Sequence, residues 1–195
     1  MVLSIIQNIS IIIAAEVLYH FLSQSFSGKA YLISIINGIL FGLTALLAMM
    51  TPFHFGPGII FDGRTIVIGI ATLFGGPLTG GIASVIAASY RIFIVGGTGY
   101  LAGVLSILEA FIIGAIFYRI RKHTKPSQDW PLIVAASILI HLFMLVAQLF
   151  LPNERWRLVL PAISPVVLTI YPIGFILVSA LFLEAEKKAV AEKDL

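Results

Sequence analysis

Apolar segments of about 20 residues recur along almost the whole chain, and their length restricts its fold more than any other feature. An α-helix of about 20 apolar residues is long enough to cross the roughly 30 Å hydrocarbon core of a bilayer. The 195 residues are 59% hydrophobic and 11% charged, and the mean hydropathy is +1.08. Soluble domains carry about 25% charged residues. We therefore predict an all-α integral membrane protein, a compact polytopic bundle of six to seven transmembrane helices that includes a short glycine-rich helical hairpin.

Short polar or glycine- and proline-rich stretches separate the predicted helices. The stretch 51–63 contains several prolines and glycines, so we expect an irregular loop there. The apolar run that follows is interrupted by Gly75, Gly76 and Pro77, and glycines that end one helix before a proline that opens the next are typical of a turn. We prefer two short helices packed as a hairpin to one long helix. The expected helices cover residues 2–24, 30–50, 64–75, 77–95, 100–120, 131–151 and 158–183, the last bent near Pro161, Pro165 and Pro172.

Basic residues between the helices predict the orientation. They cluster in the loop after residue 118 and again in the C-terminal tail, and cytoplasmic loops carry an excess of Lys and Arg. Counting membrane crossings back from these two cytoplasmic segments places the Asp-Gly-Arg loop and the N-terminus outside. One long helix over 64–95 would remove one crossing and place both inside. The first segment has no basic leader and no cleavage site, so we interpret it as a helix and not a signal peptide. The residues that decide the orientation are Arg119, Arg121, Lys122, Lys125, Lys187, Lys188 and Lys193.

Asp62, Arg64 and Arg91 are the candidate binding residues. A charge inside a bilayer is costly unless it is paired, hydrated or close to the interface. The hairpin would bring all three to one membrane face, where two guanidinium groups and one carboxylate leave an excess of positive charge suited to a small carboxylate from outside. His54, Tyr90 and Tyr100 would either add polar contacts or be ordinary interfacial aromatic and loop residues. The simpler interpretation is that the arginines extend to the headgroups and that Asp62 caps a helix.

The remaining polar and glycine residues give weaker signals. The glycines of 69–103 predict close helix packing. Glu109 either lines the pocket or pairs with His141, and we favour ordinary interhelical hydrogen bonds for these two as for Glu16, His20, Asn37 and Gln148. The scattered His, Glu and Asp predict no metal site and no cofactor, and no catalytic motif is present, so we expect no enzyme in this chain. The net charge is +3, but most of the basic residues lie between apolar segments, so we do not expect nucleic-acid binding. The chain has no cysteine, so we expect no disulfides.

The stretch GIIFDGRTIVIGIATLFGGPLTGGIASVIAASYRIFIVGGTGYLAGVL resembles the core of the LytS/YhcK-type transmembrane receptor domain. That family's pattern runs D-x-R, an apolar stretch, G-G-P and then a late R before G-G. The resemblance covers about residues 30–183. The matching residues are Asp62, Arg64, Gly75, Gly76, Pro77, Arg91, Gly96 and Gly97.

The resemblance implies a five-transmembrane sensor of the bacterial inner membrane, N-terminal to a histidine kinase or diguanylate cyclase. It implies an extracellular small anion, with carboxylates such as pyruvate among the proposed ligands, and a homodimer of the receptor class. Arg64 and Arg91 take the ligand-binding role by matching the motif, and our candidate ligand set is completed by Asp62, Tyr90, His54 and Gly97. We expect residues 1–183 to be the sensor domain and 184–195 to begin a cytoplasmic signalling helix, with no output domain in the chain.

Two other interpretations remain. A compact bundle with broken helices is also typical of small-molecule transporters and of the substrate-binding membrane subunits of uptake systems. A purely structural packing protein would have no reason to keep Arg64 and Arg91.

Overall fold

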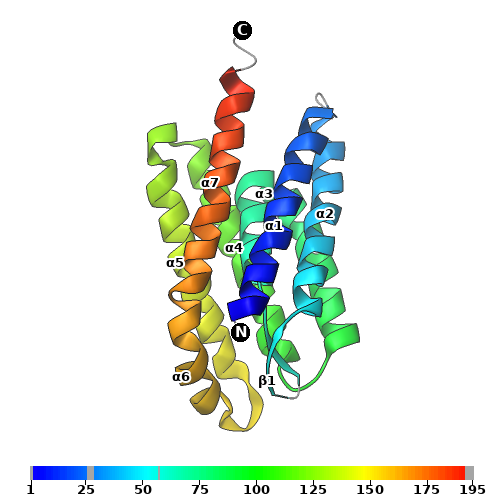
Figure 1. The fold of residues 1–195 in the computed structure, drawn as a ribbon, viewed down its shortest axis with the longest axis vertical. Helices are drawn as coiled ribbons and strands as arrows, with labels where there is room; N and C mark the ends of the chain where they lie inside the picture. The colour runs from blue at the N-terminus through cyan, green and yellow to red at the C-terminus, as the bar shows by residue number, and fades with distance from the viewer. Residues whose placement is uncertain (1, 26–28, 57, 192–195) are drawn as a thin grey trace.

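Long helices that run along one axis make up most of the molecule (Figure 1). The computed structural model describes residues 2–25, 29–56 and 58–191. Six helical stretches in this part are long and apolar enough to cross a membrane, as the length of the apolar segments predicted. The first two helices are α1 (Val2–Ser25) and α2 (Ala30–Met50), both close to the expected bounds.

The stretch after α2 is a β-hairpin and not the irregular loop we expected. Strand β1 (Phe53–Gly56) pairs antiparallel with β2 (Ile59–Phe61), with Phe53 opposite Phe61 and an irregularity in the register after His54. Aromatic and β-branched residues favour strands, and the three residues of β2 are buried. The hairpin lies at the end of the bundle opposite the C-terminus (Figure 1).

Helix α3 (Arg64–Tyr90) reverses direction in its middle, as the predicted hairpin requires. Gly76 has φ 83° and ψ 174°, which is not helical. A Cβ at Gly80 would lie 1.9 Å from Oγ1 of Thr72. Residues eight apart in an unbroken helix are separated by about 12 Å along its axis, so the two halves must lie against each other. The first half, from Arg64 to Phe74, is buried throughout and forms the centre of the core.

A π-helical turn, η1 (Arg91–Val95), follows α3 and ends the second half of the predicted hairpin. Next come α4 (Tyr100–Lys122), the short 3₁₀ turn η2 (Pro126–Gln128) and α5 (Asp129–Ala147). Two further 3₁₀ turns, η3 (Gln148–Phe150) and η4 (Pro152–Glu154), lead to the last two helices.

The C-terminal region is two helices and not the single bent helix that we predicted for 158–183. Helix α6 (Trp156–Val167) ends just before Leu168, and α7 (Ile170–Ala191) begins after Thr169. The break falls four residues before Pro172, where the proline ring would clash with a helical carbonyl and has no N–H to donate to it. Helix α7 continues through the charged segment to Ala191, whereas Lys193 lies outside the described residues.

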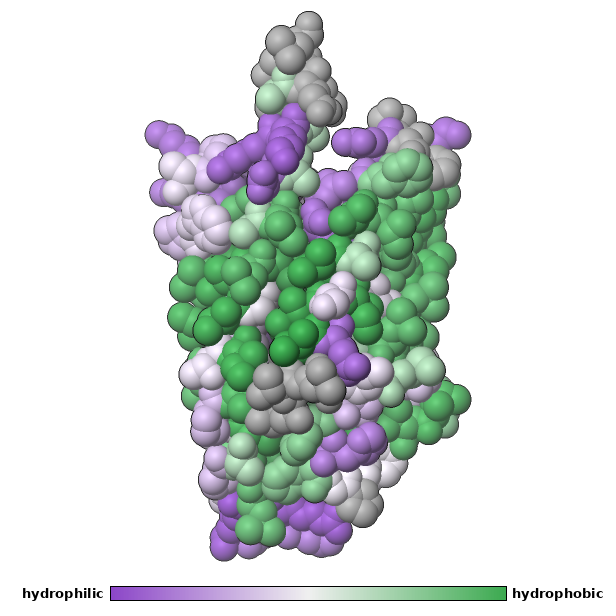
Figure 2. Space-filling view, viewed as in Figure 1, coloured by the Kyte–Doolittle hydropathy of each residue, from purple (hydrophilic) through white to green (hydrophobic). Residues whose placement is uncertain are grey.

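Polar surface gathers at the two ends of the molecule, and an apolar band lies between them (Figure 2). The α4–α5 connection and the end of α7 share one end, while β1 and α6 lie toward the other (Figure 1). The six candidate spans and this distribution make the chain a multi-pass membrane protein.

Candidate functional site

Asp62 and Arg64 form a buried ion pair where α3 begins. Asp62 Oδ1 accepts a hydrogen bond from the backbone N–H of Arg64 at 3.0 Å, and Oδ2 accepts one from Nη1 of the same residue at 2.5 Å. The first contact is the helix-capping role that the simpler interpretation gave to Asp62. The second keeps the guanidinium inside the protein: Arg64 is 3% exposed and Arg91 is 1% exposed, so neither arginine extends to the headgroups. A buried charge without such a partner is strongly destabilising.

Arg91 holds two separate loops together. Its Nη1 donates to the carbonyl oxygen of Gly96 at 2.5 Å, and its Nη2 donates to that of Gly58 at 2.8 Å. The side chain lies against α4, because a Cβ at Gly103 would be 2.4 Å from Nε of Arg91. Only glycine at 103 leaves room for this arginine. Arg91 also opens the π-helical turn, a local geometry often found at functional sites.

The α3 hairpin places Asp62, Arg64 and Arg91 at the same end of the bundle, because Arg64 begins this helix and Arg91 follows its last residue. The two loops that Arg91 holds touch directly, since a Cβ at Gly58 would be 2.6 Å from Cα of Gly97. The arginines were expected at an open outer rim, but both are buried. Arg91 is turned inward to the carbonyl oxygens of the turns at Gly58 and Gly96, and Arg64 is held inward by Asp62.

The other predicted site residues lie beside this cluster. His54 and Tyr90 line one cavity of about 340 Å³ between the β-hairpin and the end of α3. Gly97 is exposed and shapes its turn through its backbone. The motif Gly75, Gly76 and Pro77 lies at the far end of the first half of α3, where a Cβ at Gly76 would be 3.0 Å from the ring of Tyr118.

Three residues near the cluster were missed by the sequence analysis. Asn8 of α1 is 1% exposed, accepts a hydrogen bond from Thr51 Oγ1 at 3.2 Å through Oδ1, and has no partner for Nδ2. A polar residue in an apolar segment was the available signal for Asn8. Arg155 donates to Thr98 Oγ1 at 3.0 Å, and Tyr171 of α7 is influenced by the charges of Asp62 and Arg64. The positions of these two residues depend on tertiary packing, so no local sequence pattern predicts them.

A continuous seam joins the first half of α3 to α7. A Cβ at Gly69 would lie 2.8 Å from the ring of Phe175, and the rings of Phe74 and Phe182 stack at 4.7 Å. Tyr171 is at the charged end of this seam. The packing therefore connects the charged cluster to the length of α7.

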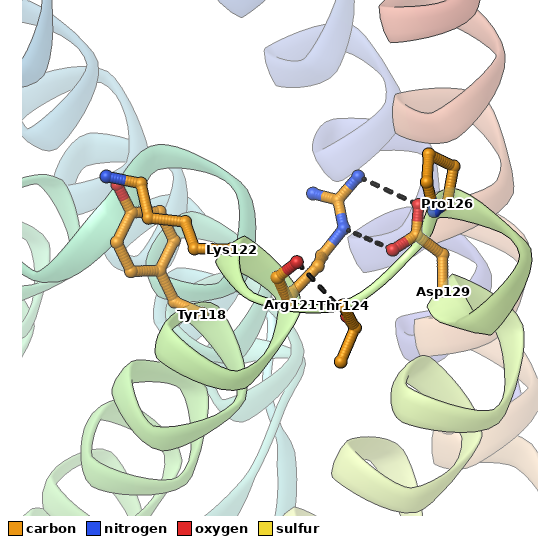
Figure 3. A pocket seen from close by; sticks show the side chains of 6 residues that line it. All are labelled: Tyr118, Arg121, Lys122, Thr124, Pro126 and Asp129. Carbon is orange, nitrogen blue, oxygen red and sulfur yellow. Dashed lines mark hydrogen bonds and ion pairs between the residues drawn. The ribbon is translucent and has the colours of Figure 1, made fainter.

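Arg121 lies at the opposite end of the bundle from the charged cluster, where it pairs with Asp129 (Figure 3). Its Nε donates to Asp129 Oδ1 at 3.0 Å and its Nη1 to Glu186 Oε1 at 3.3 Å. The guanidinium also lies 4.8 Å from the centre of the Phe74 ring. One side chain of α4 thus contacts α3, the start of α5 and the end of α7.

Of the other polar residues within the helices, Asn37 makes the interhelical hydrogen bond that we expected, whereas Glu16, His20 and Gln148 make contacts four residues apart along the same helical stretch. Glu16 and His20 lie 3.2 Å apart, Asn37 donates to Ser23 at 3.3 Å, and Gln148 donates to the Met144 carbonyl at 3.0 Å.

Glu109 and His141 do not make the interhelical hydrogen bonds that we expected. His141 donates to the Ser137 carbonyl of its own helix at 2.7 Å, and neither carboxylate oxygen of Glu109 has a hydrogen-bond partner in the described part of the chain. The interhelical hydrogen bond expected for Glu109 is therefore wrong, because the side chains that face it on α5 are apolar. Within the described residues, no group of three or more His, Asp or Glu is arranged to hold a metal ion.

Comparison with known proteins gives the family. The sequence model of the family described as 5TMR of 5TMR-LYT matches residues 6–184. The chain belongs to this 5TMR-LYT family. This match confirms the resemblance to the LytS/YhcK-type transmembrane receptor family.

One relative of this 5TMR-LYT chain is the sensor protein LytS of Enterococcus faecalis. The two are 34% identical over 80 residues, which cover 40% of this chain and 14% of the relative. The chain therefore corresponds to a small part of that protein. No solved structure matches the chain. The comparisons assign a membrane sensor domain of the LytS type and favour this class over the uptake subunits that the sequence left as an alternative.

Proposed function

We propose that this sensor domain binds a small carboxylate, such as pyruvate, at Arg64 and Arg91 on the outer side of the bacterial inner membrane. The observation that supports this most is the convergence of two buried arginines, far apart in sequence, beside a single carboxylate. Among described residues, the charged groups at this end are Arg64, Arg91, Arg155, Arg157, Asp62 and Glu154. The excess of arginine favours an anion.

The orientation is part of the proposal. Lys and Arg accumulate at the end of the bundle that carries the α4–α5 connection and the end of α7, which the positive-inside rule assigns to the cytoplasm. Arg64 and Arg91 then face the outer side. A ligand in the surrounding medium reaches them there.

In this mechanism Arg91 changes its hydrogen-bond acceptor when the ligand binds. Its present partners are the neutral carbonyl oxygens of Gly96 and Gly58, and hydrogen bonds to a carboxylate are about twice as strong as those to neutral acceptors. A ligand carboxylate would replace the Gly96 carbonyl on Nη1 and release the turn 96–99. Arg64 would keep Asp62 and offer its unpartnered Nε.

The seam between α3 and α7 would carry the signal. A ligand shifts a conformational equilibrium only through its different affinity for the two states. A shift of Arg64 would move the first half of α3, and the contacts Gly69–Phe175 and Phe74–Phe182 would pass the movement to α7. From Glu184 onward α7 would act as a cytoplasmic signalling helix, pairing with a second copy and leading to a histidine kinase or diguanylate cyclase.

Thermal unfolding of the purified protein with a panel of small carboxylates tests the site. We expect pyruvate or a related anion to raise the unfolding temperature, and an uncharged ester of the same acid to have no effect. Arg64→Ala and Arg91→Ala should lose the response. Arg157→Ala is the matched control, because Arg157 lies at the same end but its side chain is 63% exposed. An equal response from wild type and both site variants would refute the anion site.

A further inference from the structure

Glu109 places a carboxyl group without a partner near the middle of the membrane. It is the tenth of the 23 residues of α4, about 14 Å along the helix axis from Tyr100 and about 15 Å from Arg119. Those lengths put it close to the centre of a hydrocarbon layer roughly 30 Å thick. Both of its oxygens are buried, and neither has a hydrogen-bond partner among the residues that the structure describes. An ionisable group in such a place points to a function whose partner must be identified.

Neither the described chain nor a second copy of it supplies a cation at this depth. Within residues 2–25, 29–56 and 58–191, every Lys and Arg lies at an end of the bundle or, like Arg64 and Arg91, is buried among other partners. His141 donates to Ser137, and its ring packs against Tyr171 and Phe175. The described residues therefore leave Glu109 without a counter-charge, which another molecule could supply.

Glu109 lines a cavity that opens to the bilayer, with its carboxyl oxygens buried behind the lining. The cavity of about 180 Å³ lies between α4 and the α5–η3 segment, and its lining is apolar apart from Glu109. Leu108, Ile112, Phe143 and Phe150 line it and are between 45% and 57% exposed, so an occupant enters from the lipid side. The two phenylalanine rings add surfaces that attract cations.

We propose that this Glu109 groove binds an amphiphilic amine from the bilayer, with the ammonium group against the Glu109 carboxylate and the alkyl chain along the groove. The carboxylate supplies the charge complementarity, the rings of Phe143 and Phe150 flank the cationic head, and the apolar lining accepts the tail. This site is separate from Arg64 and Arg91 and does not depend on the proposed carboxylate ligand.

Equilibrium dialysis of radiolabelled decyltrimethylammonium, with the protein in dodecyl maltoside micelles, tests the site. We expect saturable binding to the wild type, at least a tenfold weaker binding to Glu109→Gln, and a severalfold weaker binding to Phe143→Leu. Glu154→Gln, which removes an exposed carboxylate at one end of the bundle, is the matched control and should bind as the wild type does. Arg64→Ala should also bind normally, which separates this site from the carboxylate site. Equal binding by wild type and Glu109→Gln would overturn the proposal.

A second measurement uses the wild type alone and so does not depend on the folding of a variant. Dicyclohexylcarbodiimide, an apolar reagent for carboxyl groups, should modify Glu109, and decyltrimethylammonium but not decanol should slow the modification. Mass spectrometry locates the adduct. Equal protection by decanol would show an apolar groove without a role for charge. Protection that instead rises with protein concentration would show a second copy covering the groove. Either result would contradict the amine site.

Discussion

At the scale of single residues, Arg91 combines a structural role with the proposed binding role. Its guanidinium donates to the carbonyl oxygens of Gly58 and Gly96, and the proposed ligand would use one of the same donors. A lysine keeps the charge but has no planar fork that reaches two acceptors in fixed directions. The two roles can therefore be separated by a conservative substitution.

We predict that Arg91→Lys lowers the free energy of unfolding by about 1–3 kcal/mol, because one buried carbonyl oxygen loses its donor. Chemical unfolding in detergent, followed by circular dichroism, measures the change. Arg157→Lys should change it by less than about 0.5 kcal/mol, as is usual for an exposed side chain. Equal stability of Arg91→Lys and wild type would mean that the two loops do not depend on this arginine.

Asp62 is predicted to compete with the ligand for Arg64. Asparagine still caps α3, but Asp62→Asn breaks a buried ion pair, a change that costs about 3–5 kcal/mol. We expect the ligand-free variant to unfold at a lower temperature and to gain more stability from pyruvate than the wild type gains. Calorimetric scans with and without pyruvate give both values. A smaller gain in a folded variant would show that Asp62 assists binding.

The sequence predicts these charged residues but not their burial. Asp62, Arg64 and Arg91 stand out because charge is rare in apolar segments. Whether an arginine at a helix end extends to the headgroups or turns inward depends on its partners, and the turn at Gly58 that accepts from Arg91 comes from another part of the chain.

At the scale of elements, the α3 hairpin depends on a few close approaches between its halves. At Gly80 a Cβ would meet Thr72 Oγ1 at 1.9 Å and Thr72 Cα at 2.9 Å, so the helices must separate to admit it. At the neighbouring Gly81 the nearest atom, on Phe111, is 3.8 Å away. These adjacent positions form a matched pair.

We predict that Gly80→Ala destabilises the protein by about 1–3 kcal/mol through overpacking. Gly81→Ala should be neutral or stabilising by up to about 1 kcal/mol, since alanine favours helix over glycine. Thermal unfolding of the two variants side by side measures the difference. If Gly81→Ala lowered the unfolding temperature more than Gly80→Ala, the close contact described here between Gly80 and Thr72 would be contradicted.

Turn chemistry explains which elements the sequence predicted well. A glycine pair followed by proline favours a turn over one long helix, and the structure has its reversal at Gly76. The β-hairpin was missed because its strands have only four and three residues and are surrounded by prolines and glycines. The α6–α7 break was placed inside one helix because three prolines in that segment allow either a bend or a stop, and only the packing decides between them.

At the scale of the whole molecule, signalling requires that the charged cluster and the end of α7 move together. The seam from Tyr171 to Phe182 supplies the contact, and Arg121 fixes α7 to α4 and α5 through Glu186 and Asp129. The sequence predicts the membrane bundle and its basic end, because apolar length and Lys/Arg counts are local properties. It does not predict this network, since its members come from four helices.

We predict that Arg121→Gln loosens the end of α7, because Glu186 loses its cationic partner. Hydrogen–deuterium exchange over residues 184–191 should become faster in this variant. Glu184→Gln, which breaks the exposed pair with Lys188, should leave the exchange unchanged. Unchanged exchange in Arg121→Gln would show that Arg121 does not hold the helix.

The central claim is that a carboxylate docks between Arg64 and Arg91, and solid-state NMR measures this contact directly. Protein with ¹⁵N-labelled arginine in lipid is mixed with pyruvate carrying ¹³C at its carboxyl carbon, and dipolar dephasing reports the distance between the two labels. We predict a contact of about 4 Å, typical of an ion pair, that disappears in both Arg64→Ala and Arg91→Ala and persists in Arg157→Ala. A contact that survives both site substitutions, or its absence in the wild type at saturating pyruvate, would contradict the account.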